Sequence, residues 1–373
     1  MTTGQALQAV PLVDLGWQHA EVAEQVQEGF AAVLASGAYV GGPDVRQFEQ
    51  EYAAWSGVRH CVGVGNGTDA LELALRACDV GRGDEVVLPA NTFVATAEAV
   101  VRAGAVPVLA DVDERCLLLD PEAVEAVAGP RTRALLPVHL FGQTAPVEQF
   151  AHLVDERGLV VIEDAAQSQG ATRFGRPAGA LGRVAATSFY PGKNLGAYGD
   201  AGGVLTDDDD VARRVRLLGN HGSSVKYQHD ELGFNSRMDT LQAVVLRAKL
   251  TRLAEWNALR QAAAHRYDEL LGDVAGVRLP GRLSGNVDVW HLYVVRVHDR
   301  DAVLDRLAAA GVGAGVHYPV PVHLQPAFRS LGKGPGTFPV AEAAAQQILS
   351  LPLFPGITVE QQHRVAHELR GAL

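Results

Sequence analysis

The stretch HCVGVGNGTDALELALRA, residues 60–77, predicts a strand, a glycine-rich turn and a helix in immediate succession. Residues 60–64 are an apolar run of the length of a short strand. Residues 68–77 follow a helical pattern, and we expect the helix to be capped near Thr68 or Asp69. A strand that leads directly into a helix is the unit from which parallel sheets are built.

The same alternation of apolar runs and helical segments continues towards the C-terminus. We expect strands at residues 85–88, 106–110, 134–138, 159–162, 185–189 and 203–206, and helices at 92–103, 121–127 and 146–157. Strands that alternate with helices predict a mostly parallel sheet with helices on both faces, which is an α/β fold.

The pattern changes after Gly233. Residues 238–271 predict one long helix that can break near Trp256, and a stretch rich in glycine and proline follows over 272–286. A strand at 290–297 and helices at 301–310 and 358–373 complete the chain. Since 373 residues exceed one ordinary core, we expect two domains. A large domain with an N-terminal arm would cover residues 1–250, and a smaller C-terminal α+β domain would cover 251–373.

The composition excludes several classes of protein. The 32 basic and 43 acidic residues give a net charge of -11, which argues against non-specific binding of nucleic acids. Residues 1–15 lack the basic and apolar segments of a signal peptide, and the chain has no run of about 18 apolar residues that could span a membrane. We therefore expect a cytoplasmic protein that does not cross a membrane.

No metal site is expected from the sequence. The three cysteines, Cys61, Cys78 and Cys116, have no metal-like spacing and are expected to be small buried residues. The acidic run at 207–210 is expected at the solvated start of a helix, where carboxylates suit the positive end of the helix dipole.

The loop GNGTD, residues 65–69, is suited to an anion such as a phosphate. Its glycines let the backbone come close to a ligand, the start of the helix supplies free N–H groups, and Thr68 adds a hydroxyl group. Taken alone, such a loop is more often a plain turn and helix cap. It lacks the G-x-G-x-x-G spacing of dinucleotide-binding proteins, and no P-loop lysine follows it.

Two further residues follow predicted strands, where ligands of such sheets bind. Asp164 ends the apolar strand at 159–162, and burying its carboxylate is costly unless it meets a positive partner such as a pyridinium nitrogen. A helix cap or an internal salt bridge would satisfy it equally well. Lys193 lies in a loop bent by proline and glycine, after Ser188, a further phosphate donor. A lysine attacks a carbonyl group only when neutral, so burial or a nearby cation must lower its pKa.

Six runs together resemble the DegT/DnrJ family of nucleotide-sugar aminotransferases. They are GNGTDALELAL, PANTFVATAEAV, VIEDAAQ, SFYPGKNLGAYGDAGG, LGFNSRMDTLQAVVL and SLPLFPGIT, in this order. The resemblance implies the pyridoxal-phosphate-dependent transferase fold of the aspartate-aminotransferase type, and a homodimer with active sites at its interface. It also implies transfer of an amino group from L-glutamate, which leaves as 2-oxoglutarate, to a nucleotide-linked keto sugar.

The resemblance also implies which residues bind the cofactor, pyridoxal phosphate. Lys193 matches the lysine that holds the cofactor as a Schiff base and moves the substrate proton. Asp164 matches the partner of the pyridine nitrogen, and Gln167 matches the residue that faces the phenolic oxygen. Phe93 falls where an aromatic ring stacks on the cofactor, although simple core packing would also explain it. The phosphate cradle is matched by Gly67, Thr68 and Ser188.

Other residues are implied to reach the site from its edges. Asn235 matches a phosphate ligand contributed by the other subunit. Arg237 is a candidate for a carboxylate or sugar-phosphate contact, and a structural ion pair is an equal alternative. The side chains expected to approach the sugar are Tyr190, His317 and Tyr318.

Two positions depart from the family pattern. Gln169 stands where the family usually has histidine, and Ala201 stands in place of a glycine of Gly-Asp-Gly-Gly. Both changes can alter the edge of the pocket. Some relatives replace the cofactor lysine with histidine and become sugar dehydratases, and Lys193 argues against that branch.

The form of the lysine loop, PGKNLG, with KYQHDELGFNSRMD after it, resembles enzymes that act at carbon 3 of dTDP-linked 3-keto-6-deoxyhexoses. Such enzymes make amino sugars for antibiotics and surface glycans. A carbon-4 keto sugar or a keto cyclitol is the alternative within the family. Two alternatives come from other classes: a non-catalytic regulator that binds the cofactor, and a nicotinamide-dependent sugar dehydrogenase, which would need the missing glycine fingerprint.

Overall fold

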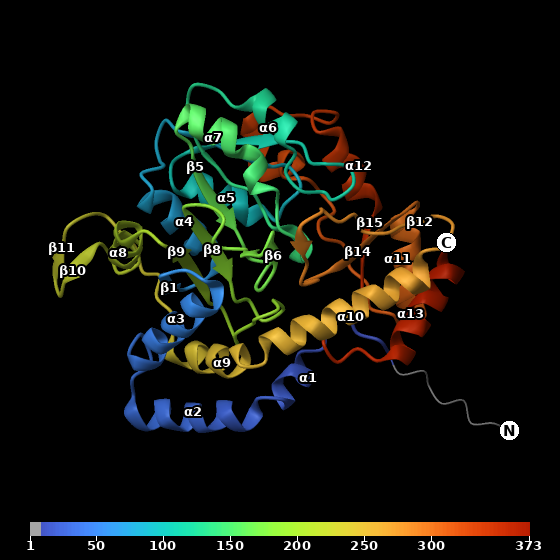
Figure 1. Cartoon of the computed structure of the whole chain (residues 1–373), viewed down its shortest axis with the longest axis horizontal. Coiled ribbons are helices and arrows are strands. Elements are labelled where there is room, and N and C mark those ends of the chain that lie inside the picture. Colours follow the sequence, from blue (N-terminus) through green and yellow to red (C-terminus); the bar gives the residue numbers. More distant parts are fainter. Residues whose placement is uncertain (1–8) are drawn as a thin grey trace.

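The computed structural model describes residues 9–373, and within that range a sheet of seven strands forms the centre of the molecule (Figure 1). The order across the sheet is β1-β9-β8-β5-β4-β2-β3. The strands are β1 His60–Val64, β2 Glu85–Pro89, β3 Val106–Ala110, β4 Thr132–Leu135, β5 Val160–Asp164, β8 Val184–Ser188 and β9 Gly202–Thr206. Only β9 among these runs antiparallel to its neighbours, β1 and β8. The predicted mostly parallel sheet is confirmed.

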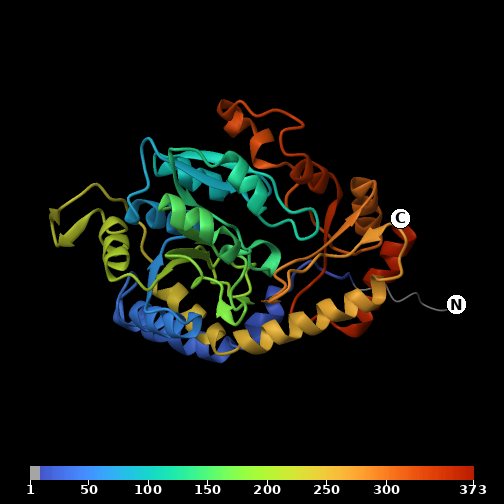
Figure 2. The same ribbon diagram turned by 45° about the horizontal axis from the view of Figure 1, so that its top comes forward.

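Helices cover both faces of the sheet, as the alternation predicted (Figure 1, Figure 2). They are α3 Pro43–Ser56, α4 Gly67–Ala77, α5 Val94–Arg102, α6 Pro121–Val127, α7 Ala151–Arg157, α8 Asp209–Leu218 and α9 Thr240–Leu250. Neighbouring residues of one strand enter different apolar cores, because side chains of a strand point to alternate faces. Val86 of β2 packs in the core that includes α4 and α5, and Val87 packs in the core that includes α6 and α7.

The chain before β1 is helical, although the sequence analysis predicted no element there. Helices α1 Leu15–Ala20 and α2 Ala23–Ser36 precede α3, and both α2 and α3 contact α9. Local signals for these helices are present. Gly37 ends α2 in the left-handed conformation, with φ 67°, and Pro43 occupies the first turn of α3.

The cap of α4 differs from the expected one. The helix begins at Gly67, and the side chain of Asn66 accepts a hydrogen bond from the backbone N–H of Asp69 at 2.8 Å. The prediction of a cap at Thr68 or Asp69 is therefore wrong. Asparagine caps helices as well as aspartate does, and the extended backbone of Asn66 places its acceptor at the helix start.

Three other boundaries also differ. The long helix expected over 238–271 is divided at Thr251 into α9 and α10 Leu253–Leu271, whereas Trp256 is buried in the core. The helix expected over 146–157 consists of a 3-10 turn, η2 Val147–Phe150, followed by α7. Strand β4 ends before Pro137, which has no N–H to donate to a neighbouring strand.

The C-terminal part is built on a second, three-stranded antiparallel sheet that packs against helices (Figure 2). Its elements are β12 Val277–Arg278, β14 Tyr293–Val297, β15 Ile348–Leu351, α10, α11 Arg300–Ala309, α12 Pro339–Gln347 and α13 Val359–Ala372. Val10 pairs with Val312, so the start of the described chain joins this part. Leu292 and Phe338 belong to the apolar core of the central sheet, so the two parts share contacts. The division at residue 250 stays a prediction.

Short elements complete the described chain. They are β6 Thr172–Arg173, β7 Arg176–Pro177, β10 Ser223–Val225, β11 Gln228–His229, β13 Asn286–Val287, η1 Leu140–Gly142, η3 Val322–Leu324 and η4 Pro326–Leu331. The hairpin of β10 and β11 projects from one side of the molecule (Figure 1).

The acidic run at 207–210 opens α8 as predicted, with Asp208 accepting hydrogen bonds from the next turn. The three cysteines are buried and form no disulfide. Within residues 9–373 we find no group of side chains suited to a metal ion and no helix with the length and apolarity to cross a bilayer.

Candidate active site

A cavity of about 840 Å³ lies beyond the carboxyl ends of β5 and β8, where ligands of such sheets bind. Its volume is comparable with that of sites that enclose whole ligands. It brings together ten of the predicted site residues, which come from five separate regions of the chain. They are Gly67, Thr68, Phe93, Asp164, Gln167, Ser188, Tyr190, Lys193, His317 and Tyr318.

Lys193 follows β8 in a loop that several hydrogen bonds hold in place. Its backbone N–H donates to the carbonyl oxygen of Tyr190 at 2.9 Å. The next side chain, Asn194, donates to Asn257 and to the carbonyl oxygen of Val289, both at 2.9 Å. Burial lowers the pKa of Lys193 to about 8, against the opposing effect of the Asp164 charge. The predicted lowering of this pKa is therefore present, and burial is its cause.

Asp164 is the last residue of β5, and its side chain is 6% exposed. One carboxyl oxygen, Oδ2, accepts a hydrogen bond from the Thr96 hydroxyl group at 2.8 Å, and the other accepts one from Ala166 N at 3.2 Å. Burial raises the pKa of Asp164, while these hydrogen bonds and the charge of Lys193 act in the opposite direction. The carboxyl group therefore lines the cavity without a salt-bridge partner within hydrogen-bonding distance among the described residues.

The neighbouring carboxylate, Glu163, has a structural function that the sequence analysis did not identify. It accepts hydrogen bonds from the backbone N–H groups of Gly179, Leu181 and Gly182 at 2.7–2.8 Å. A fourth contact, of 2.7 Å, joins it to Nε2 of His139. Since Nδ1 of His139 accepts from a backbone N–H, Nε2 carries the hydrogen. Glu163 is thus fully paired, and Asp164 is the carboxyl group that faces the cavity.

The orientation of the Gln167 amide is fixed by two neighbours. Its oxygen accepts from the backbone N–H of Phe141 at 2.7 Å, and its nitrogen donates to the Tyr318 hydroxyl group at 3.1 Å. The ring of Tyr318 lies 5.3 Å from that of Phe93, measured between ring centres. Gln167 therefore connects the turn at η1 with the C-terminal part of the chain, and one of its amide hydrogens remains available.

The start of α4 and the end of β8 approach each other very closely. A Cβ atom added to Gly67 would lie 2.6 Å from Cβ of Ser188, so only glycine fits there. The N-terminus of α4 offers free backbone N–H groups and the positive end of the helix dipole, and Thr68 and Ser188 add hydroxyl groups. This combination fits a phosphate group.

These residues fit the pyridoxal phosphate that the resemblance implies. The site offers a buried lysine with a lowered pKa, a buried carboxyl group for a ring nitrogen, and a cradle for a phosphate. Phe93 is 51% exposed and lines the cavity, so its ring is available to stack on a ligand. Core packing does not explain Phe93.

Asn235 and Arg237 do not line this cavity. The side-chain oxygen of Asn235 accepts from Nε of Arg237 at 3.1 Å, and a second nitrogen of Arg237 donates to Asn220 at 3.3 Å. Between them, the hydroxyl oxygen of Ser236 accepts from Gly65 N at 3.0 Å. The segment therefore lies next to the glycine loop, but its two predicted ligands point elsewhere within one chain.

The two departures from the family pattern lie behind the site and not at its edge, contrary to the expectation. The amide nitrogen of Gln169 donates to the carbonyl oxygen of Ser188 at 2.8 Å and to the hydroxyl group of Thr187 at 3.1 Å. Ala201 is buried beside β8, and its carbonyl oxygen accepts from Phe189 N at 2.8 Å. Neither residue lines the cavity, and both are buried and bond to the backbone at the end of β8 or just after it.

Several further residues that shape the site were not among the predicted ones. Thr92 and Thr96 lie beside Asp164, and His291 lines the cavity. Burial and the positive charges of neighbouring groups, Lys193 among them, hold the pKa of His291 well below its usual value. Thr92 lies just before α5 and Thr96 in its first turn, and their hydroxyl oxygens are 2.8 Å apart.

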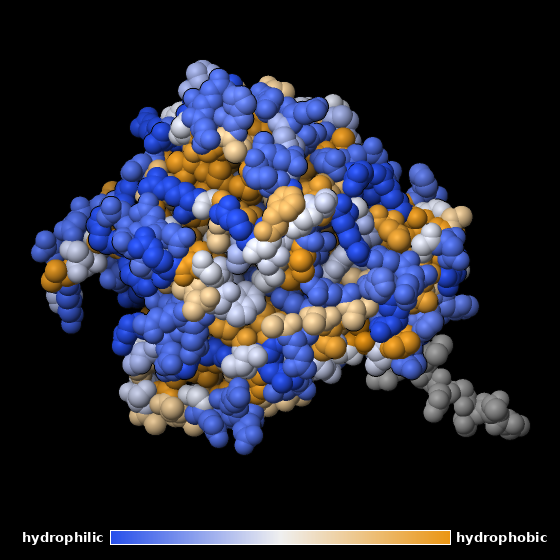
Figure 3. All heavy atoms as spheres, viewed as in Figure 1, coloured by the Kyte–Doolittle hydropathy of each residue, from blue (hydrophilic) through white to orange (hydrophobic). Residues whose placement is uncertain are grey.

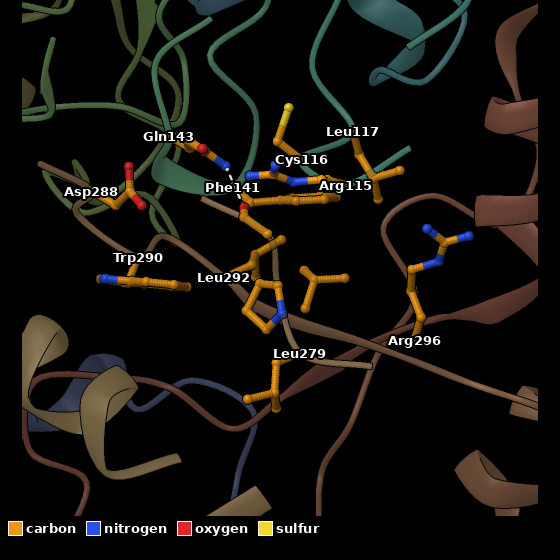
Figure 4. Close-up of a pocket in the computed structure, with 13 residues that line it drawn as sticks. Arg115, Cys116, Leu117, Phe141, Gln143, Leu279, Asp288, Trp290, Leu292 and Arg296 are labelled. Atoms are coloured by element: carbon orange, nitrogen blue, oxygen red, sulfur yellow. Dashed lines mark hydrogen bonds between the residues drawn. The ribbon is translucent and has the colours of Figure 1, made fainter. Parts of the chain in front are cut away.

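A second, much smaller cavity of about 30 Å³ adjoins this region (Figure 4). Leu292 lines both cavities. Around the small one, the amide nitrogen of Gln143 donates to the carbonyl oxygen of Gly281 at 3.1 Å, and its oxygen accepts from Leu283 N at 2.8 Å. This volume holds a water molecule but is too small for a substrate. The cavity is therefore a small gap in the packing between the two parts of the chain.

Known aminotransferases resemble this chain over almost its whole length. Residues 20–370 match the profile described as the DegT/DnrJ/EryC1/StrS aminotransferase family. The erythromycin biosynthesis sensory transduction protein EryC1 of Saccharopolyspora erythraea is 47% identical over 362 residues, which cover 97% of this chain and 99% of that protein. The dTDP-3-amino-3,4,6-trideoxy-alpha-D-glucose transaminase of Streptomyces venezuelae is 45% identical over 361 residues, which cover 97% and 95%. The crystal structure of S. venezuelae DesV in complex with a ketimine intermediate has a TM-score of 0.96 at 45% identity and covers 98% of both chains.

Proposed function

This chain belongs to the DegT/DnrJ/EryC1/StrS aminotransferase family and is a pyridoxal-phosphate-dependent aminotransferase, and from that premise we propose that its amino acceptor is a nucleotide-linked keto sugar. The proposed reaction places the amino group on carbon 3 of a dTDP-linked 3-keto-6-deoxyhexose. L-Glutamate is the proposed donor and leaves as 2-oxoglutarate. The product would be an amino sugar for an antibiotic or a surface glycan.

The observation that carries the proposal is the presence of Lys193 and Asp164 in one cavity of about 840 Å³. The choice of carbon 3 is supported by the S. venezuelae relative, whose name describes a 3-amino sugar and whose sequence matches almost the whole chain. The form of the lysine loop supports the same choice.

Bound pyridoxal phosphate supplies a carbonyl carbon for the amino group and a ring that withdraws electrons from it. Lys193 is the residue proposed to hold the cofactor covalently. Because burial lowers the pKa of Lys193 to about 8, the share of its amine that is neutral at pH 7 rises to about one tenth. A neutral Nζ atom is a nucleophile and can take up a proton from a substrate carbon.

The other residues are proposed to orient the cofactor. Asp164 would pair with the ring nitrogen, and the free amide hydrogen of Gln167 would face the phenolic oxygen. Phe93 would cover the ring. The phosphate would be bound by Gly67, Thr68 and Ser188.

The sugar is proposed to contact Tyr190, His317 and Tyr318, which line the same cavity. Gln167 donates to the oxygen of Tyr318, so the hydroxyl hydrogen of Tyr318 remains available for a ligand. Burial raises the pKa of Tyr318, so this hydrogen is retained at neutral pH. Tyr318 is therefore proposed as a hydrogen-bond donor to the substrate.

A homodimer with shared active sites would account for Asn235 and Arg237. Both residues lie outside the cavity of their own chain, and Asn235 is proposed to bind the cofactor phosphate of the partner subunit. Near them the hairpin of β10 and β11 projects with side chains that a lone subunit leaves in water (Figure 3). Tyr227 is 85% exposed and Leu232 is 92% exposed. These side chains suit a contact with a second copy.

A second candidate, a regulatory protein that binds the cofactor without catalysis, is favoured by the name of the S. erythraea relative. The lowered pKa of Lys193 and its position with Asp164 in one cavity support catalysis instead. Turnover separates the two candidates, because a regulator would bind the cofactor and glutamate without forming an amino sugar.

The decisive experiment supplies the purified enzyme with pyridoxal phosphate and L-glutamate, and offers dTDP-3-keto and dTDP-4-keto 6-deoxyhexoses side by side. We expect 2-oxoglutarate and an amino sugar with the 3-keto compound only. Preference for the 4-keto compound, or for a keto cyclitol, would replace the carbon-3 assignment. Inertness towards all of them, with an unchanged cofactor absorbance after glutamate is added, would reject the proposed reaction.

A further inference from the structure

Two threonines stand behind Asp164 and connect it to α5. Oγ1 of Thr96 lies 2.8 Å from Oδ2 of Asp164, and Oγ1 of Thr92 lies 2.8 Å from Oγ1 of Thr96. All three side chains are buried. The three groups therefore form one line of hydrogen bonds that ends on the carboxyl group facing the cofactor site.

The direction of this line follows from counting hydrogens, since each hydroxyl group donates one. If Thr96 donates to an ionised Asp164, Thr92 donates to Thr96 and both hydrogens have acceptors. If Asp164 is protonated and donates to Thr96, the order reverses, and the hydrogen of Thr92, which is 3% exposed at the wall of the cavity, has no further protein acceptor within residues 9–373. A buried donor without an acceptor is unfavourable. The line therefore favours the ionised form of Asp164.

We propose that Thr92 and Thr96 form a hydroxyl relay that keeps the carboxyl group of Asp164 ionised and aimed at the cofactor, which makes Thr96 a positioning residue of this site. The inference rests on the proposed pairing of Asp164 with the cofactor ring nitrogen and not on the identity of the sugar. Thr96 also lies in the first turn of α5, where the helix dipole favours a nearby negative charge.

Several groups compete for the charge state of Asp164. Burial raises the pKa of its carboxyl group, and the hydrogen bond from Thr96 is the first of the effects that lower it. The N–H of Ala166, the positive charge of Lys193, after β8, and the neighbouring imidazole of His139, after β4, act in the same direction. Tyr318, in the C-terminal part, is near enough for the Asp164 charge to help raise the pKa of its hydroxyl group. Among these groups, the hydrogen bond from Thr96 does most to offset the rise in the Asp164 pKa that burial causes.

The first test compares Thr96→Val with Thr96→Ser in the full-length protein. Valine keeps the shape of the side chain without its hydroxyl group, and serine keeps the hydroxyl group. We expect Thr96→Val to weaken the affinity for pyridoxal phosphate by about 10- to 100-fold, the range for a hydrogen bond to a charged group. Thr96→Ser should stay within about 3-fold of the parent, and Thr92→Val should cause a smaller loss than Thr96→Val. Equal affinities of Thr96→Val and Thr96→Ser would overturn the proposal.

The second test uses the protein without cofactor and measures urea unfolding as a function of pH. A carboxyl group with a raised pKa binds a proton in the folded state that the unfolded chain has released. Stability attributable to Asp164 therefore falls as the pH rises above the ordinary value of 3.8. The fall should extend to higher pH in Thr96→Val than in Thr96→Ser, so that the two midpoints separate as the pH rises. Parallel curves would contradict the relay.

The third test repeats Thr96→Val in an Asp164→Asn background. If Thr96 acts through the carboxylate, the valine adds less than about 2-fold to the loss of cofactor affinity that asparagine already causes. An equal loss in both backgrounds would show that Thr96 only fills space and would overturn the proposal. Unchanged affinity in Asp164→Asn alone would overturn both the relay and the role of Asp164. None of these measurements uses a sugar substrate. They therefore test the relay even if the proposed keto sugar is incorrect.

Discussion

The Nζ atom of Lys249 donates a hydrogen bond to the carbonyl oxygen of Gly196 at 2.7 Å and so ties α9 to the loop that carries Lys193. The same ammonium group lies 4.5 Å from the centre of the Tyr198 ring. Seven residues earlier on α9, Gln242 accepts a hydrogen bond from Tyr198 N at 2.9 Å. One helix therefore holds the loop at two points, and burial lowers the pKa of Lys249 to about 8.

Replacing Lys249 with methionine should change the pH dependence of stability. The ordinary pKa of lysine is 10.5, so between pH 8 and 10.5 the unfolded chain binds a proton that the folded protein has lost. Stability of the parent therefore rises with pH in this window, by up to about 1.4 kcal/mol per pH unit relative to Lys249→Met. Urea unfolding of both proteins across the window measures the difference. If the difference in unfolding free energy between the two proteins did not vary with pH, the lowered pKa of Lys249 would be contradicted.

Replacing Lys193 with alanine should abolish transamination and leave the fold intact. The variant lacks the amine that is proposed to bind the cofactor and to move the proton, and we expect turnover to fall by at least about 10³-fold. The visible absorbance of the bound cofactor should change as well. Lys333→Ala, which removes an exposed lysine, serves as the control with normal turnover. Substantial activity of Lys193→Ala would reject the assignment.

Gly67→Ala tests the phosphate cradle. The added methyl group would lie 2.6 Å from Cβ of Ser188, which cannot move without shifting the β8 strand end. We expect the affinity for pyridoxal phosphate to fall by at least about 10-fold, as overpacking of a tight contact implies. Gly192→Ala is the matched control, because its methyl group would meet nothing nearer than 3.8 Å. Equal affinities of the two variants for pyridoxal phosphate would reject the assignment of the phosphate site to Gly67.

Glu163→Gln tests the structural carboxylate behind the site. Its oxygens accept from three backbone N–H groups and from His139, so an amide would turn its own N–H hydrogens towards donors. We expect the free energy of unfolding to fall by about 2–4 kcal/mol. Glu156→Gln, on an exposed side chain of α7, should change it by less than about 0.5 kcal/mol. Denaturant unfolding of the three proteins decides, and equal stabilities would refute the role of Glu163.

Mixing Lys193→Ala with Asn235→Ala tests whether active sites are shared. In a homodimer with Asn235 contributed by the partner, each variant alone is impaired. A mixed dimer, however, contains one site with both native residues. After unfolding and refolding together, we expect activity well above that of either variant, approaching about one quarter of the parent value for random pairing. If mixing restored nothing although mixed dimers were isolated, Asn235 would act within its own chain.

Much of this protein could be predicted from short stretches of sequence. The alternation of strands and helices, the loops at their ends and the exposed acidic start of α8 depend on the spacing of apolar residues and on turn residues, which act locally. Lys193 and Asp164 were identifiable because Asp164 ends a strand and Lys193 lies in the loop after one. The helices before β1 were not predicted, although Gly37 at the end of α2 and Pro43 at the start of α3 are local signals for them.

What only the tertiary structure decided depends on contacts between residues far apart in the chain. Glu163 and Asp164 are neighbours of the same chemical type, and the folded protein alone assigns one to backbone N–H groups and the other to the cavity. Thr96 meets Asp164 from 68 residues away, and Lys249 meets Gly196 from 53 residues away. No local pattern encodes such pairs, because packing across the sheet brings them together. Sequence alone therefore determined the fold class and singled out Lys193 as the proposed cofactor lysine. The packing of α5 and α9 decided which side chains bond to Asp164 and to the loop that carries Lys193.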